Sequence, residues 1–283
     1  MPASLGIAVL AVAGGCAGRP EAPIVQQPTG TAAAATAAAV AALLPADVLL
    51  VGEQHDATEH QQIEQQVVAH LAAGNLLAAL ALEMADSGVS TAALKPGATD
   101  QQARNALKWD DKSWPWAAYG PAVMTAVRAG VPVLGANLPR AQMQGSMADS
   151  QLDTQLPGPA LKAQQQGIRL GHCNLLPESQ IRPMTRIQIA KDITMANTLS
   201  QMVLPGKVVL LLAGNGHVNR TLGVPQHLPA DLKVKALRLR AGGADAADHM
   251  GAGAFDSVWS TAALADTDYC AGLRQQLAPD AKP

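Results

Sequence analysis

Aromatic side chains are scarce in this chain of 283 residues: they make up 2% of it, as four Trp, two Tyr and one Phe. The core must therefore consist mainly of Leu, Val and Ala, and each aromatic residue carries more information than usual. Three cysteines are too few for a disulfide scaffold. The formal net charge is only −2, which excludes a protein that binds nucleic acid by bulk neutralisation of phosphates.

Long apolar runs are also missing. No run reaches the roughly 18 residues that a membrane-spanning helix needs, so the sequence excludes a polytopic membrane protein. Hydrophobic residues make up 48% of the chain and charged residues 15%, the opposite of the balance that disorder requires. The length allows one large globular domain or two small ones.

The first residues are typical of an export signal. Leu5 to Val12 is a short apolar stretch, and small residues follow it up to Cys16. This ending resembles a bacterial lipobox, in which the chain is cut before a cysteine that then receives lipid. We expect residues 1–15 to be a signal peptide, Cys16 to be lipidated, and the Pro-rich residues 16–30 to be a tether. An ordinary secretory signal or an Ala-rich helix is the alternative. The expected location is the bacterial cell envelope, lipid-anchored and facing the periplasm.

Short apolar runs alternate with stretches of helical spacing, which indicates an α/β fold. Residues 31–283 are expected to form a largely parallel β-sheet flanked by helices. Two stretches without strands, at about 87–114 and 140–204, are expected to be helical insertions that form a smaller cap or subdomain. The expected strands are Asp47–Val51, Leu76–Leu82, Val131–Leu134, Lys207–Leu212 and Val234–Leu239, and the expected helices include Ala32–Leu44, Thr58–Ala73 and Tyr119–Ala129.

Polar residues follow four of these strands. Because ligands bind beyond the carboxyl ends of parallel strands, these side chains are the candidates for a site. Any one of them alone is more typical of a helix cap or a surface charge, but their coincidence after four strands favours a function. They are Glu53, His55, Glu83, Asp86, Asn137, Arg140 and His217.

Two Gly-x-x-His motifs occur among them, Gly52-Glu53-Gln54-His55 and Gly214-Asn215-Gly216-His217, with Glu83 between them in the chain. This pattern resembles the superfamily that joins the Tiki and TraB proteins, the erythromycin esterases and the ChaN haem-binding lipoproteins. Further blocks are most similar to the ChaN branch; they surround Trp114-Pro115-Trp116, Asn137, His172-Cys173 and Asp192.

The resemblance implies a haem-binding envelope lipoprotein of haem or iron acquisition, with iron held by a Tyr and a possible haem-mediated homodimer. A phenolate is a hard ligand that suits ferric haem. Tyr119 is the expected iron ligand, because Trp114 and Trp116 nearby could stack on a porphyrin; a core position is its alternative. Tyr269 is expected to be structural. His55 and His217 are expected to hydrogen-bond an iron-bound Tyr or a propionate, and His172 is a further candidate. The expected partners are haem and the membrane, with no nucleic acid.

A hydrolase is the alternative function. Glu53, His55, Glu83 and His217 could share a divalent metal such as Zn, Mn or Fe, which would activate water as the Tiki resemblance implies. Without metal, His55 with Glu53 could act as a general base, as in the erythromycin esterase branch.

Four further features have no role in either reading. Cys173 and Cys270 could pair in an oxidising compartment, or remain two buried thiols. Met84, Met143, Met147 and Met184 could line an adaptable apolar pocket, although Met is more often ordinary core. The Gly-rich segment from Ala241 to Gly253 is expected to be a flexible loop, and His60 could face the same edge of the sheet as His55.

Overall fold

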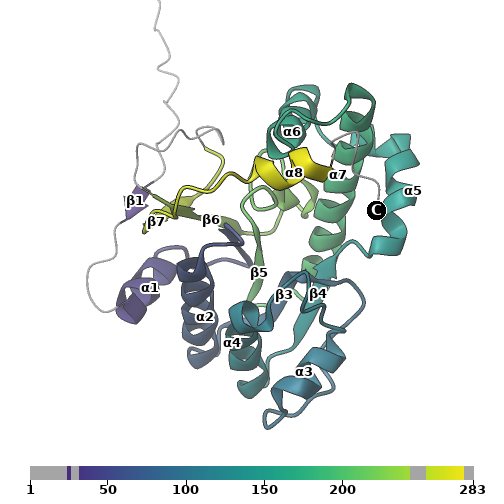
Figure 1. Cartoon of the computed structure of the whole chain (residues 1–283). Helices are drawn as coiled ribbons and strands as arrows, with labels where there is room; N and C mark the ends of the chain where they lie inside the picture. Colours follow the sequence, from purple (N-terminus) through teal and green to yellow (C-terminus); the bar gives the residue numbers. More distant parts are fainter. Residues whose placement is uncertain (1–23, 27–31, 243–252, 277–283) are drawn as a thin grey trace, which may run out of the picture.

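The computed structural model describes residues 24–26, 32–242 and 253–276. Within them, seven parallel strands form one sheet in the order β1-β7-β6-β2-β5-β3-β4 (Figure 1). The predicted α/β fold with a parallel sheet is confirmed. The strands are β1 Ile24–Gln26, β2 Val48–Glu53, β3 Leu77–Asp86, β4 Val133–Asn137, β5 Val208–Gly214, β6 Val234–Ala241 and β7 Ser257–Thr261.

The central strands are buried on both faces. Leu49 and Val51 of β2 point into one hydrophobic core, and Val48 and Leu50 point into another on the opposite face. Strands covered on both sides need apolar residues at every position rather than at alternate ones. This explains the continuous apolar runs in the sequence.

Helices cover both faces of the sheet. Helices α1 (Ala32–Ala41), α2 (Thr58–Ala73) and α4 (Trp116–Arg128) lie on one face, where they contribute Val40, Val67 and Val123 to the core. Helix α7 (Glu178–Ser200) covers the other face with Met195, Ala196 and Leu199. Figure 1 shows α1, α2 and α4 together and α7 across the sheet from them.

A smaller helical part stands at one end of the sheet. It consists of α5 (Arg140–Ala148), the 3-10 helix η1 (Ser150–Thr154), α6 (Gly158–Gly171) and α7. Leu138, Leu152, Leu156 and Ile189 form its own small core. It occupies the stretch expected to be a helical insertion, and the C-terminal helix α8 (Cys270–Gln276) lies beside it (Figure 1).

Several elements differ from the predictions. The stretch 87–114 contains only α3 (Asp100–Ala106) and is otherwise irregular. Three residues of the expected tether form β1, which pairs with β7, and neither of these strands was predicted. A second 3-10 helix, η2 (Val224–His227), precedes β6.

The signal peptide, Cys16 and the interior of the Gly-rich loop from Ala241 to Gly253 lie outside the described residues. In the part of the chain that the structure describes, no helix is long and apolar enough to cross a membrane.

Candidate functional site

The two Gly-x-x-His motifs meet at the carboxyl edge of the sheet. Strand β5 lies between β2 and β3, so Glu53 at the end of β2, Gly214 at the end of β5 and Glu83 in β3 become neighbours. We call Glu53, His55, Glu83, Asp192 and His217 the rim cluster. Four of its five members were expected at this edge from the sequence, and Asp192 was not.

The glycine of each motif makes room for the other motif. A Cβ atom on Gly52 would clash with Val218 Cγ2 and would lie 2.7 Å from Asn215 Oδ1. A Cβ atom on Gly214 would lie 3.0 Å from His55 Nε2. Both separations are too short for ordinary packing. The glycines are therefore required because strand ends and side chains from the two motifs approach closely here.

Glu53 accepts hydrogen bonds from three different elements. Its Oε1 accepts the Tyr119 hydroxyl of α4 at 2.7 Å and lies 2.8 Å from His55 Nδ1. Its Oε2 accepts the Gln61 amide of α2 at 2.5 Å. Glu53 is only 2% exposed, and these bonds supply the polar contacts that a buried carboxylate needs.

Tyr119 is 1% exposed, in the core between α4 and the sheet. Burial, followed by the charge of Glu53 and the hydrogen bond to it, raises the pKa of the phenol far above its ordinary value. A phenolate would have to form beside a buried carboxylate that already accepts the phenol proton. This geometry argues against the expected role of Tyr119 as the iron ligand and agrees with its alternative, a core position.

His217 is held between two buried carboxylates. Its Nε2 lies 3.2 Å from Glu83 Oε1, and its Nδ1 lies 2.5 Å from Asp192 Oδ1. Burial lowers the pKa of the imidazole, but the charges of Glu83 and Asp192 outweigh it and raise the pKa to about 10. His217 is thus an imidazolium at neutral pH and cannot serve as a general base.

The pKa values of Glu83 and Asp192 shift in opposite directions, although both carboxylates contact His217. Burial alone would raise the pKa of Glu83, but His217, Lys191 and His55 together lower it well below the ordinary value. Burial dominates at Asp192 and raises its pKa to about 6. Its second oxygen has no hydrogen-bond partner among the described residues. Glu83 also accepts the backbone N–H of Gly214 at 2.9 Å.

His55 is the accessible member of the rim cluster, with 41% of its side chain exposed. Burial lowers its pKa, but the hydrogen bond to Glu53 and the charge of Glu83, 3.9 Å from Nε2, leave it raised. The Trp114 ring meets the imidazole edge-on at 4.8 Å. The site therefore presents the partly exposed imidazole of His55, whose raised pKa favours the protonated form, next to the indole of Trp114.

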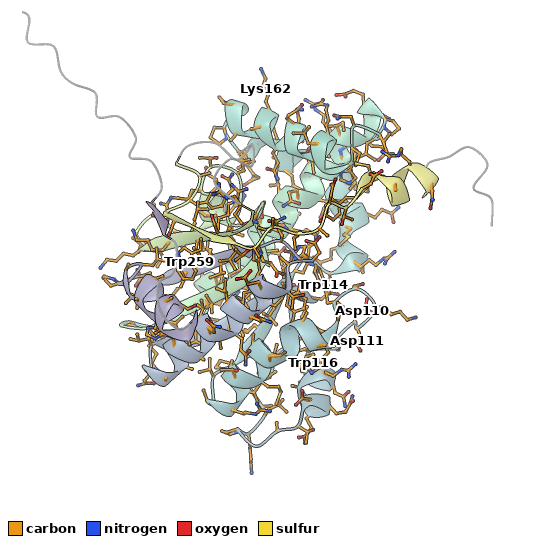
Figure 2. All side chains as sticks on the ribbon, turned by 60° about the vertical axis from the view of Figure 1, so that its left-hand side comes forward. Asp110, Asp111, Trp114, Trp116, Lys162 and Trp259 are labelled. Carbon is orange, nitrogen blue, oxygen red and sulfur yellow. A yellow bond between two sulfur atoms is a disulfide. The ribbon has the colours of Figure 1, made fainter. Side chains whose placement is uncertain are left out.

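Trp114 and Trp116 lie in different surroundings. Trp114 contacts both His55 and Tyr119. Trp116 packs instead against Trp109, with its indole N–H donating to Asp100 at 3.0 Å. Figure 2 labels Trp114 and Trp116 in the same region of the molecule. Only Trp114 therefore touches the rim cluster.

The C-terminal segment returns to the first motif. Tyr269 is 63% exposed, and its hydroxyl donates to Asp56 Oδ2 at 2.5 Å. This hydrogen bond raises the pKa of the phenol. The next residue, Cys270, forms a disulfide with Cys173, so of the two alternatives that the sequence left open the structure shows the pairing. Tyr269 thus contacts the residue that directly follows His55 in the chain.

Two other histidines are engaged elsewhere. His172 Nδ1 lies 2.8 Å from the carbonyl oxygen of Ile168 at the end of α6. His60 is fully buried, accepts the backbone N–H of Gln54 and contacts Thr261. Neither has a hydrogen bond to the rim cluster, and His60 does not reach the solvent-exposed edge.

Several buried polar residues at the site were missed from the sequence. Asp192 interrupts the apolar stripe of α7 between Ile189 and Met195, and an acidic residue in such a stripe is a detectable signal. On α2, Gln61 binds Glu53, while Glu64 is fully buried with neither oxygen partnered among the described residues. Burial, and after it the charge of Glu53, raises the pKa of Glu64 well above its ordinary value.

The geometry does not support the metal-dependent alternative. Among the described residues, no group of three or more His, Cys, Asp or Glu side chains is arranged to hold a metal ion. Both oxygens of Glu53 accept hydrogen bonds, and His217 uses both ring nitrogens for carboxylates.

The protein is an α/β protein whose parallel sheet has helices on both faces. Its candidate site, a cluster of carboxylates and imidazoles, lies at the carboxyl edge of that sheet. Residues 39–228 match the model of the family described as haem-binding uptake, Tiki superfamily, ChaN, and the chain belongs to this family. The resemblance seen in the two motifs is thereby confirmed.

Two solved structures are similar to the chain. The ChaN protein of Campylobacter jejuni, whose structure shows cofacial haem binding, is 29% identical with a TM-score of 0.61, and the match covers 74% of this chain and 87% of that one. The type III effector HopBA1 is 17% identical with a TM-score of 0.47, covering 86% and 99%. A search of curated proteins finds no match.

Proposed function

We propose that this chain binds haem for haem or iron acquisition, at the surface formed by Tyr269, His55 and Trp114. Membership of the ChaN family supports haem as the ligand, as does the similarity to a protein that binds haem cofacially. The observation that carries the assignment to this surface is the exposed Tyr269 beside the first Gly-x-x-His motif. Haem, when bound, supplies a ferric iron that a phenolate suits.

Tyr269 fits this role better than Tyr119. Its hydroxyl is accessible, and the acceptor of its proton is the exposed Asp56 rather than a buried carboxylate. Asp56 holds the phenol in one orientation and can take its proton as the oxygen becomes a ligand. Tyr119 then has a positioning role, since it holds Glu53 and thereby His55.

The neighbouring residues fit a porphyrin with acidic side chains. His55 tends toward the charged form and is exposed, so it can pair with a propionate. Trp114 offers an aromatic surface next to it. His217 is too buried to touch a ligand, and His172 lies at the border of this surface, one residue from the disulfide.

The envelope location remains part of the proposal. The disulfide between Cys173 and Cys270 supports an oxidising compartment, and a lipid on Cys16 would anchor the chain there. Fractionation of cells that express Cys16→Ser tests the anchor: the variant should leave the membrane pellet for the soluble periplasmic fraction. Its retention in the pellet would contradict lipidation at Cys16.

A haem-mediated homodimer is also proposed. Leu170 and Leu175 are 48% and 36% exposed, and both lie within three residues of Cys173, which is bonded to the neighbour of Tyr269. An apolar surface around an exposed ligand favours pairing of loaded chains. Light scattering of the protein with and without haem should show a dimer only with haem; a monomer in both would contradict it.

The decisive experiment is a ferric haem titration of three proteins. The wild-type chain should give a high-spin spectrum with a phenolate charge-transfer band. Tyr269→Phe should lose this band and bind haem about ten-fold or more weakly, because only an exposed oxygen is removed. Tyr119→Phe, the matched control, should keep the band. Loss of the band in Tyr119→Phe alone would return the ligand role to Tyr119, and no change in either would exclude a tyrosine ligand.

A further inference from the structure

A cavity of about 500 Å³ opens beside the rim cluster, beyond the carboxyl ends of β3 and β4. Strands β3 and β4, the irregular stretch around α3, and the start of α5 all contribute to its walls. Its size is within the usual range of small-molecule sites. Three of its residues, Asp86, Asn137 and Arg140, follow predicted strands, and none of them has a role in the proposed haem surface.

One end of the cavity offers hydrogen-bond acceptors. Asp86 and Asn137 are directly paired at the ends of β3 and β4, and both line the cavity. Asn137 is 9% exposed, and its Oδ1 is buried with no hydrogen-bond partner among the described residues. A buried acceptor without a partner is costly, so this end gains from a ligand whose N–H donor draws the Asn137 amide toward the cavity.

Cations provide the second polar feature. Arg140 and Lys108 line the same cavity, and neither forms an ion pair within the described part of the chain. The carboxylate of Asp110 is already occupied by Lys112 N–H and the Ser113 hydroxyl. Two unpaired cations are therefore available for a carboxylate.

The backbone of Lys108 shows that this cation is placed at a conformational cost. Its φ of 47° lies in the left-handed region, just after α3, where glycine is the favoured residue. A lysine at such a position destabilises the fold relative to glycine. Strain retained beside a cavity is consistent with a functional side chain.

The remaining wall is apolar. Met84, Leu107, Trp114 and Met143 contribute it, so two of the four methionines expected to line a pocket do so. Met and Trp adapt to apolar groups of varied shape. The cavity thus combines two hydrogen-bond acceptors at one end, two cationic side chains, and an apolar wall of adaptable side chains.

We propose that this cavity binds a small zwitterion with an apolar body, of the class of apolar dipeptides. Its ammonium group bonds to Asn137 Oδ1 and Asp86, its carboxylate bonds to Arg140 and Lys108, and its side chains pack on Met84, Leu107 and Met143. Its polar contacts involve neither Tyr269 nor His55, and its apolar wall shares Trp114 with the proposed haem surface.

The first test compares three probes on the haem-free wild-type protein by calorimetry. Leucyl-leucine should bind at millimolar concentration or below. N-acetyl-leucyl-leucine, which lacks the ammonium, and leucyl-leucine amide, which lacks the carboxylate, should each bind about ten-fold more weakly. Equal binding of the three, or no binding of leucyl-leucine, would overturn the proposal.

The second test uses variants that should weaken binding without making the protein less stable. Lys108→Gly should raise the midpoint of thermal unfolding, because glycine suits the left-handed backbone, yet weaken leucyl-leucine binding. Asn137→Leu, of nearly the same shape, should fold without loss of stability and weaken binding of the ammonium-bearing probes only. Lys162→Gln on α6, far from Trp114 in Figure 2, is the control and should bind as wild type. Unchanged affinity in both Lys108→Gly and Asn137→Leu would overturn the proposal.

Discussion

Two buried carboxylates of the rim cluster, Glu83 and Asp192, share one imidazole. His217 separates Glu83 from Asp192, and these three side chains are 5%, 4% and 0% exposed. Without the imidazolium, two carboxylates would share a site that water does not reach. Removal of one partner from a buried ion pair costs more than the pair contributes, because the remaining charge is left uncompensated. His217 is therefore a structural cation of the edge at which the two motifs meet.

Substitution of His217 should change the pH dependence of stability. The folded pKa of about 10 lies above the unfolded value of 6.5, so the stabilisation is complete below pH 6.5 and is lost as the pH rises toward 10. The free energy of unfolding of the wild type should fall by a few kcal/mol over this window. His217→Gln should be less stable at pH 7 and lack the decline.

Urea denaturation across this pH range measures both effects. The matched control is His70→Gln, at a half-buried position in the last turn of α2, which should keep the wild-type decline. An identical pH profile for the wild type and His217→Gln would show that the imidazole is neutral in the folded protein.

At the scale of the element, the end of β3 depends on a glycine in β4. The register of this strand pair shifts between Leu82 and Asp86, as in the bulges that re-aim side chains near sites. A Cβ atom on Gly135 would clash with the Asp86 carbonyl oxygen and would lie 2.9 Å from that of Ala85. Gly135 therefore permits the close crossing that places Glu83 and Asp86 at the edge of the sheet.

Gly135→Ala should destabilise the protein by about 1 to 3 kcal/mol, because the clash is with backbone that cannot move aside. Gly167→Ala is the control: this glycine is exposed in the middle of α6, and a methyl group on it would meet no neighbouring atom within 4 Å. The control change should stabilise the protein by about 0.5 to 1 kcal/mol. Chemical denaturation measures both. Equal stabilities of Gly135→Ala and the wild type would contradict the close crossing.

The predicted elements differ in how far they could be located from the sequence. Helix α2 was predicted with its observed bounds, since its apolar spacing is regular. All five predicted strands exist, and each continues beyond its predicted end. In three of them the extension includes a polar strand residue, namely Glu53, Glu83 or Asn137. A pattern based on apolar runs ends at the first polar residue.

Other features depend on tertiary contacts that no local pattern encodes. Strands β1 and β7 are short and lie at one edge of the sheet, where no apolar run is needed. Proximity to Trp114 favoured Tyr119 over Tyr269, but burial of one and exposure of the other depend on how α4 and the C-terminal segment pack. The meeting of Glu53, His55, Glu83 and His217 followed from parallel topology alone.

At the scale of the whole molecule, one covalent bond holds the C-terminal segment to the helical part. Cys173 lies between α6 and α7, and Cys270 begins α8, 97 residues later. Because Tyr269 precedes Cys270, the bond also holds this phenol near Asp56.

Loss of the disulfide should destabilise the protein by about 2 to 4 kcal/mol, since a loop of this length is expensive to close in the unfolded chain. The Cys173→Ser/Cys270→Ser double variant should therefore unfold at lower denaturant than the wild type. Dithiothreitol should lower the wild-type midpoint and leave that of the double variant unchanged, which separates loss of the bond from the effect of the serines. A midpoint equal to that of the oxidised wild type would contradict this role.

The position of β5 determines when the sheet can close. It pairs with β2 on one side and β3 on the other, yet it begins at Val208, long after both have been synthesised. Both strands that pair with β2 in the described structure, β5 and β6, come after residue 200, so the backbone N–H and C=O groups along its edges remain unpaired until then. Pairing of such distant segments requires closure of long loops, which slows folding. The nascent chain must therefore remain unpaired at its centre until most of it has been made, which leaves a long interval for helper proteins to act on it.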